Sequence, residues 1–187
     1  SNPYKISEFT LIRKDPQYVG RAKAAQEFEK ARVADDKEKA GTFYQVLKAV
    51  GVDTPVEELM KTTGIGSVLY AKRPGDGSAR EYAASCQKVL GGLANICIEY
   101  ATKRYRSNLI NWGMLPFIYE EEELPFANGD YLFIPGIADA IKTKKKEIPA
   151  YVVKDGKLNP FTLKMGELTD DERDIILKGC LINYNRK

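Results

Sequence analysis

The amino-acid sequence predicts an α/β fold with a partly parallel mixed sheet and an additional helical segment at the amino terminus. Short apolar runs alternate with stretches whose charge spacing and length are typical of helices. The clearest example joins an apolar run at 67–71, a predicted helix at 79–90 and a second apolar run at 93–100. This order of strand, helix and strand favours a right-handed parallel crossover.

The front segment, residues 1–65, is predicted to be mainly helical and carries no motif. A helix begins at Asp15-Pro16, because aspartate caps a helix and proline is tolerated in its first turn, and it continues over 17–33. Two more helices are predicted over 37–50 and 56–61, and residues 4–12 have the weak pattern of an edge strand. We expect this segment to serve packing or contact with a neighbouring domain.

Residues 66–187 are predicted to form the core of a single domain that spans 1–187. Further elements are predicted as a helix at 103–112, strands at 115–119 and 130–135, a helical turn at 137–142, and a hairpin that joins 151–153 to 161–163 through Asp155-Gly156. The final helix begins with a capping box of Thr169 and Glu172. Its predicted apolar stripe contains Ile175, Ile176, Gly179, Cys180 and Ile182.

Composition narrows the classes of function. The net charge of +3 comes from 29 basic and 26 acidic residues, which argues against a dedicated nucleic-acid binder. No apolar run approaches the length of a membrane span and no signal peptide opens the chain, so we expect a cytoplasmic protein with no membrane contact. The chain begins Ser1-Asn2-Pro3 without an initiator methionine, so we expect a piece of a longer protein. Ser1-Asn2 could be native or a tag remnant.

The chain offers few metal ligands. It contains no histidine, and its three cysteines are too widely spaced for a metal-binding pattern or an even disulfide set. We therefore expect this chain to bind no metal or cofactor, and we expect Cys86, Cys97 and Cys180 to be buried, reduced thiols. Any proton transfer here must use a hydroxyl, a carboxylate, a lysine or a tyrosine.

The segment between the first predicted strand and its helix is the best candidate site. Pro74, Gly75 and Gly77 end the strand and allow a tight turn. Ser78 then falls at the start of the helix, where free backbone N–H groups favour an anion. Arg80 adds a guanidinium that suits a carboxylate or a phosphate. The segment is thus suited to an anionic ligand.

A structural interpretation of the same residues stands beside this one. Ser78 and Glu81 also have the spacing of a capping box, and such boxes are common. The two interpretations do not exclude each other, since a capping serine is held where negative charge is stabilised. The lysine and arginine clusters at 103–106 and 142–146 could contact phosphate, but solvated surface or contact with another domain is the simpler explanation.

Five blocks of sequence together resemble the aconitase superfamily. The segment from Gly75 to Ala84, G-D-G-S-A-R-E-Y-A-A, resembles the G-x-G-S-S-R-E-H-A-A signature of the swivelling C-terminal domain, which the small subunit of isopropylmalate isomerase shares. Further matches are Gly91-Gly92, Ser107-Asn108-Leu109 with Gly113 to Phe117, Gly129-Asp130 through Gly136, and Gly179 to Asn183. The resemblance covers residues 67–187 well and the front segment poorly.

The resemblance implies a layered β/β/α swivel domain of a hydro-lyase that dehydrates and rehydrates a hydroxy-carboxylic acid. It implies that Ser78 is the catalytic base, that Arg80 binds a substrate carboxylate and that Ala79 contributes its backbone N–H to substrate binding. The substrate would bind on a [4Fe–4S] cluster held by preceding domains of the same polypeptide, so we expect the isolated chain to be inactive. None of its three cysteines matches a cluster ligand.

Departures from the signature leave the substrate open. Ala79 replaces the second serine, Tyr82 replaces the histidine, and Asp76 stands where glutamate is common. Three alternatives also stay open: a free-standing small subunit of an isopropylmalate isomerase-type enzyme, an RNA-binding module that uses the lysine clusters, and a purely structural domain in which the loop is an ordinary cap.

Overall fold

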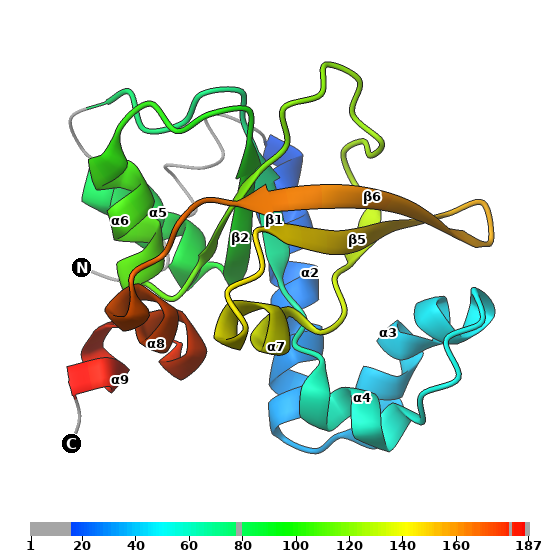
Figure 1. Ribbon diagram of the computed structural model, residues 1–187. Helices are drawn as coiled ribbons and strands as arrows, with labels where there is room; N and C mark the ends of the chain where they lie inside the picture. Colours follow the sequence, from blue (N-terminus) through cyan, green and yellow to red (C-terminus); the bar gives the residue numbers. More distant parts are fainter. Residues whose placement is uncertain (1–15, 78–79, 180, 186–187) are drawn as a thin grey trace.

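A six-stranded mixed sheet organises the molecule (Figure 1). The computed structural model describes residues 16–77, 80–179 and 181–185. The strands are β1 (Ser67–Tyr70), β2 (Gly92–Cys97), β3 (Leu115–Ile118), β4 (Tyr131–Phe133), β5 (Glu147–Lys154) and β6 (Lys157–Met165), in the order β1-β2-β3-β6-β5-β4. The first three strands are parallel, and the remaining pairings are antiparallel. The predicted α/β class with a partly parallel mixed sheet is confirmed.

The positions of the helices along the chain are close to those predicted from the sequence. They are α2 (Pro16–Val33), α3 (Lys37–Ala49), α4 (Val56–Thr62), α5 (Arg80–Val89), α6 (Lys103–Asn111), α7 (Ile137–Lys142), α8 (Asp170–Lys178) and α9 (Leu181–Asn185). The helical front segment is therefore confirmed, while the edge strand expected at 4–12 lies outside the described residues. Among the residues that the structure describes, no helix is long and apolar enough to cross a membrane.

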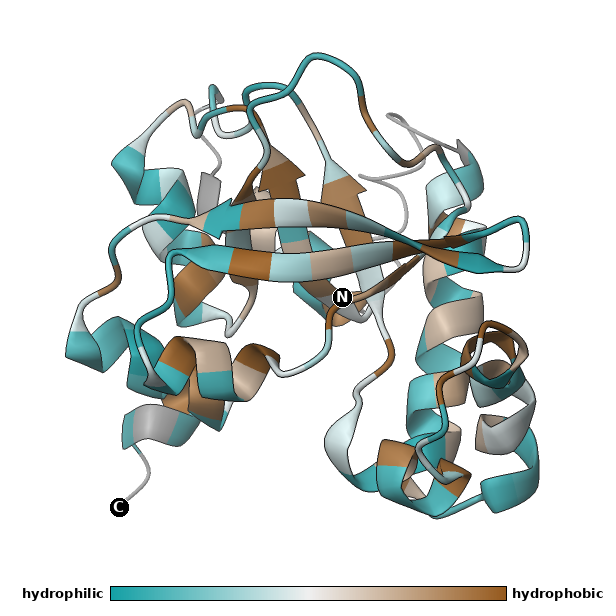
Figure 2. Cartoon of the chain, turned by 45° about the vertical axis from the view of Figure 1, so that its right-hand side comes forward, coloured by the Kyte–Doolittle hydropathy of each residue, from teal (hydrophilic) through white to brown (hydrophobic). Residues whose placement is uncertain are grey.

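Strand β2, the middle one of the three parallel strands, separates two buried layers. Ala94 and Ile96 share a hydrophobic cluster with Ile148 of β5 and Leu163 of β6. The alternate residue Asn95 faces the opposite way and bonds to a side chain of α6. The β5–β6 hairpin thus covers one face of the parallel strands and helices cover the other, which gives the predicted β/β/α layering (Figure 1). Figure 2 shows apolar residues concentrated on the parallel strands between these layers.

The front helices pack onto the same sheet at two places. Tyr18 of α2 lies within 3.0 Å of the Ser67 hydroxyl at the start of β1, and α2 packs against Leu69 on the helical face. At the other edge of the sheet, the ring of Phe43 in α3 meets the ring of Tyr131 in β4 edge-on, with centroids 5.6 Å apart. The front segment therefore spans the sheet from β1 to β4.

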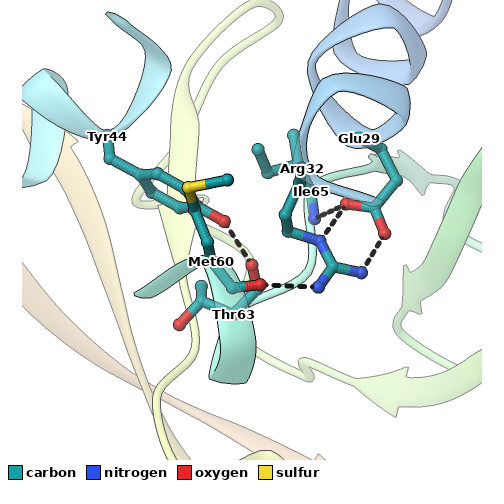
Figure 3. A network of polar contacts seen from close by, with 6 residues as sticks. All are labelled: Glu29, Arg32, Tyr44, Met60, Thr63 and Ile65. Atoms are coloured by element: carbon teal, nitrogen blue, oxygen red, sulfur yellow. Dashed lines mark hydrogen bonds and ion pairs between the residues drawn. The ribbon is translucent and has the colours of Figure 1, made fainter. Parts of the chain in front are cut away.

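A charged network joins the front helices to the strand that follows them (Figure 3). The Glu29 carboxylate accepts hydrogen bonds from Arg32 Nε at 2.7 Å and from the Ile65 backbone N–H at 2.8 Å. Arg32 in turn donates from Nη1 to the Met60 carbonyl at 2.8 Å. The hydrogen bond to Glu29 raises the pKa of Arg32, so the guanidinium stays charged. These bonds hold α2 against α4 and the segment that leads into β1.

Helix α3 is fastened to the same connection by Tyr44. Its hydroxyl donates to the Thr63 carbonyl (Figure 3). The side chain is fully buried, and desolvation raises the pKa of Tyr44 to about 12. A neutral phenol that donates one hydrogen bond is therefore part of the core between α3 and the end of α4.

The carboxyl terminus corrects one prediction. The capping box of Thr169 and Glu172 is present and begins α8. The apolar stripe, however, does not continue through one helix to Ile182, because Gly179 adopts φ 88° and ends α8 in a left-handed cap. Ile182 is 63% exposed on the separate helix α9, and Cys180 lies outside the described residues.

The turn after α6 touches the end of α8. Gly113 adopts φ +75°, and a Cβ atom at this position would lie 1.8 Å from the Gly179 carbonyl oxygen. Only glycine allows both this conformation and this approach. Two blocks that resemble the aconitase superfamily in the sequence therefore meet in space.

We predict that Gly113→Ala lowers the free energy of unfolding by more than about 3 kcal/mol, since it adds a backbone clash to the strain of a left-handed alanine. Gly129→Ala is the matched control, because Gly129 has φ +88° and nothing lies within 4 Å of its Cβ position. It should cost only about 1–2 kcal/mol. Urea titrations of both variants measure the difference, and equal losses would contradict the contact.

Glu29→Ala should lower the free energy of unfolding by about 1–2 kcal/mol, because it leaves the Arg32 guanidinium and the Ile65 N–H without their acceptor. Glu27→Ala removes a carboxylate from the same helix, where it pairs with Lys30 in an exposed position. That change should stay within about 0.5 kcal/mol. Urea denaturation compares the two, and a loss at Glu29 no larger than at Glu27 would refute a structural role for the network.

Candidate active site

The predicted loop lies at the carboxyl ends of the parallel strands. The carbonyl of Lys72, just after β1, accepts hydrogen bonds from the backbone N–H groups of Ile98 and Glu99 at 3.2 and 3.3 Å. The carbonyl of Pro74 accepts one from Ala101 at 3.0 Å. The loops that follow β1 and β2 therefore run side by side. Ligands of open α/β sheets bind at this edge, where the strands end.

The glycine turn is confirmed at Gly75. This residue has φ +93°, and a Cβ atom there would lie 2.4 Å from the Cβ of Tyr105. The backbone therefore passes directly over the Tyr105 side chain, which leaves no room for a larger residue. Gly77 follows on the exposed side of the turn, and α5 begins at Arg80.

The proposed site residues themselves are only partly visible. Ser78 and Ala79 lie outside the described residues, so the predicted base, the N–H contact and the competing capping box all stay predictions. Arg80 is the first residue of α5, and its side chain is not described. The structure does place a turn before Ser78 and a helix directly after Ala79, as the sequence predicts.

A polar pair beneath the loop was missed by the sequence analysis. Asn95 Nδ2 donates to the Tyr105 hydroxyl at 2.9 Å, and the two residues are 1% and 5% exposed. Asn95 Oδ1 has no hydrogen-bond partner among the described residues. The sequence did offer one sign of this pair, an asparagine within the apolar run at 93–100, because a buried amide needs a polar partner.

Comparison with known proteins identifies the family. The sequence matches the Aconitase C-terminal domain family over residues 23–122, which is more than half of the chain. The chain belongs to the aconitase C-terminal domain family. The resemblance noted in the sequence is thereby confirmed.

Relatives of two kinds share this aconitase C-terminal domain. Aconitate hydratase A of Bradyrhizobium diazoefficiens is 31% identical over 114 residues, which are 59% of this chain and 12% of that protein. The homoaconitase small subunit of Thermus thermophilus is 39% identical over 74 residues, which are 39% of this chain and 45% of that subunit. The chain thus matches less than half the length of either relative.

A solved structure is also similar. The 3-isopropylmalate dehydratase of Methanocaldococcus jannaschii superposes with a TM-score of 0.46 at 32% sequence identity, covering 72% of this chain and 70% of that one.

The matched range corrects our expectation about the front segment. We expected a poor resemblance before residue 67, but the match to the aconitase C-terminal domain begins at residue 23, within α2. The matched part of α2 contacts the rest of the unit, since Gln26 Nε2 donates to the Val89 carbonyl at the end of α5 at 3.1 Å. Residues 123–187, which we expected to resemble the family well, lie beyond the match.

The cysteines do not form a metal site in the described part of this domain. Cys86 of α5 and Cys97 of β2 are free and buried, as predicted, whereas Cys180 lies outside the described residues. Within the described ranges there is no group of three histidine, cysteine, aspartate or glutamate residues that could hold a metal ion. The described residues of this chain therefore do not fit a [4Fe–4S] cluster.

Exposed ion pairs occur both at the candidate site and in the predicted lysine cluster. At the candidate site, Arg73 Nε lies 3.1 Å from a Glu99 carboxylate oxygen, and both side chains are exposed. In the predicted lysine cluster, Lys144 lies 3.2 Å from Asp170. Such exposed pairs contribute little stability and leave a solvated surface. This arrangement agrees with a solvated surface at the lysine cluster of residues 142–146.

Two hollows of the described surface lie away from the loop. One, of about 240 Å³, lies between α7 and α8 and is lined by Ile141, Lys145 and Leu168 among others. The other, of about 440 Å³, lies between α2 and the start of β2 and includes Val33 and Leu93. Neither is lined by residues 71–77.

The thiol of Cys97 belongs to the buried layer below the candidate site. Its sulfur lies 3.7 Å from the Phe117 carbonyl, to which the Tyr100 hydroxyl donates at 3.0 Å. Burial raises the pKa of Cys97 from an ordinary value of 9.0 to about 11. Burial also raises the pKa values of Tyr100 and Tyr105. All three groups are therefore neutral at physiological pH.

We predict that the free energy of unfolding falls as the pH rises from about 9 to about 11. The unfolded thiol loses its proton near pH 9 while the folded thiol of Cys97 keeps it until about pH 11, so deprotonation favours the unfolded state across this window. Urea titrations between pH 7 and pH 11 measure the slope. Cys97→Ala should flatten it, and identical slopes for the variant and the wild type would contradict the assignment.

Proposed function

We propose that this chain is the swivel domain of an aconitase-family hydro-lyase that dehydrates and rehydrates a hydroxy-carboxylic acid. One observation carries the proposal. In a chain of this family, a glycine turn follows β1 at the carboxyl ends of the parallel strands, and helix α5 begins five residues after Gly75, at Arg80. The signature segment that starts at Gly75 therefore occupies the edge of the sheet where ligands of α/β folds bind.

Ser78 is proposed as the base. As an alkoxide it takes a proton from the carbon next to a substrate carboxylate, and the electron pair of that C–H bond forms the double bond. The hydroxyl leaves the neighbouring carbon with the electron pair of its C–O bond and becomes water with a proton from solvent. A serine is a weak base in water, so its alkoxide needs stabilisation. The start of α5, a helix of ten residues, supplies free N–H groups and the positive end of the helix dipole. The chain has no histidine that could take this role.

Arg80 and Ala79 are proposed to hold the substrate. The guanidinium of Arg80 binds a carboxylate through two parallel hydrogen bonds, which fixes both position and orientation. Ala79 has no side-chain hydroxyl, so its contribution is limited to the backbone N–H. Since the homologous signature has serine there, we propose that this chain serves a substrate with one fewer polar group at that contact.

The rest of the enzyme is proposed to lie in preceding domains of the same polypeptide. A [4Fe–4S] cluster held there would supply a Lewis acid for the departing hydroxyl. We expect no turnover by the chain alone and a cytoplasmic location for the whole protein. The match to the homoaconitase small subunit of Thermus thermophilus favours a second arrangement, in which this chain is a separate subunit that binds a larger one.

Ser78→Ala should lower the turnover of the complete enzyme by at least about 10³-fold, because the proton acceptor is lost. Hydration of cis-aconitate and of homoaconitate, followed by absorbance, provides the measurement. Ser107→Ala is the control, since Ser107 is exposed and its hydroxyl donates to the Lys103 carbonyl within α6. A Ser78→Ala enzyme with wild-type turnover would falsify the proposed base.

A further inference from the structure

We infer that Tyr105 is a positioning residue: its ring supports the glycine turn and thereby sets where α5 starts and where Ser78 is held. This inference rests on the function proposed above, because it assigns Tyr105 a task in that reaction. It concerns a side chain outside the signature segment, in the predicted helix at 103–112.

The first step is the contact between the turn and the ring. The Cβ position of Gly75 lies 2.4 Å from Tyr105 Cβ and 2.6 Å from Tyr105 Cγ. A real Cβ atom could not come so close, so a glycine is needed here, and its backbone packs against the tyrosine side chain. A displacement of the ring must therefore move the turn or open a gap beneath it.

The second step is that Tyr105 is held at both ends. Its backbone N–H donates to the Thr102 hydroxyl at 3.1 Å, in the N-cap of α6. Its own hydroxyl accepts from Asn95 of β2 at 2.9 Å. The ring of Tyr100 packs beside it with centroids 6.4 Å apart. A residue that is 5% exposed, fixed in the first turn of α6 by its backbone and bonded to β2 by its side chain, is a rigid support.

The third step concerns the other contacts of the turn. The carbonyls of Lys72 and Pro74, before Gly75, bond to the loop after β2. Asp76 and Gly77 are exposed. The ion pair of Arg73 with Glu99 is also exposed, with side chains 65% and 62% accessible, and such pairs contribute little. Against these, the Tyr105 ring is a buried contact directly under the turn.

The consequence follows from distance along the chain. Ser78 is three residues after Gly75, and Arg80 begins α5 two residues later. A shift of the turn by about 1 Å would be passed to Ser78, the nearer residue, and a misplacement of that size can cost about 10²-fold in rate. Tyr105 thus acts on the reaction through Ser78 without contact with the substrate.

Hydrogen exchange of the 187-residue chain tests the positioning directly. Tyr105→Leu should speed exchange of the amides at 75–84 by at least about 10-fold relative to those of the β5–β6 hairpin. Leucine keeps Cβ and Cγ but lacks the rest of the ring and the hydroxyl that accepts from Asn95, so the atoms under the turn lose their anchor. Tyr105→Phe keeps the ring and should have a smaller effect. Tyr18→Phe is the matched control, since it removes another buried tyrosine hydroxyl at the opposite end of β1. It should leave exchange at 75–84 within about twofold.

Turnover of the complete enzyme tests the link to Ser78. Tyr105→Leu should lower kcat by about 10- to 100-fold with KM within about threefold, using cis-aconitate and homoaconitate. If Tyr105 acts through Ser78, the double variant Ser78→Ala/Tyr105→Leu should be no slower than Ser78→Ala alone. A purely structural role instead predicts losses that multiply.

The outcomes separate the two proposals. Unchanged exchange at 75–84 in Tyr105→Leu overturns the inference, whatever the enzyme does. Faster exchange with multiplying kinetic losses overturns its catalytic part. If Ser78→Ala retains full turnover, the proposed base is wrong, while the exchange result still decides whether Tyr105 holds the turn.

Discussion

The structure depends on a strand that is buried on both sides. In β2, Ala94 and Ile96 pack under the β5–β6 hairpin, and Asn95 and Cys97 lie against the helical layer. A strand of this kind needs two covering layers, because either face alone would leave apolar surface in water. The hairpin supplies one layer, and α2, α5 and α6 supply the other. The loops at the carboxyl ends of the parallel strands emerge between them, and the candidate site lies there.

The candidate site is built by backbone more than by side chains. The loop after β1 is hydrogen-bonded along the loop after β2, and the left-handed residue Gly75 packs against a tyrosine. This arrangement suits a reaction in which a weak base must be held still at a helix start, since preorganised dipoles stabilise charge without rearranging. The neutral Cys97, Tyr100 and Tyr105 below add rigidity without adding charge.

Much of the fold could be predicted from local patterns, because caps, turns and periodicity act over a few residues. Thr169 with Glu172, and the turn at Asp155-Gly156, are where the sequence placed them. Strand β5 is longer than predicted. Its buried residues from Ile148 onward alternate with more exposed ones, so the strand does not appear in the sequence as one continuous apolar run. The Asn95–Tyr105 bond could not be predicted, because it joins two elements. The roles of Ser78, Ala79 and Arg80 rest on the family and on the loop's place at the sheet edge.

The order of the strands has a consequence for synthesis of the protein. The parallel half of the sheet is joined to the antiparallel half by β3 and β6, so that Phe117 pairs with Met165. While a ribosome is still translating the residues between them, β3 has one neighbouring strand and an open edge. Exposed strand edges and long-range pairing favour misassembly of nascent chains. The sheet can close only after β6 has left the exit tunnel, so chaperone contact with the nascent chain is expected to matter most just before that moment.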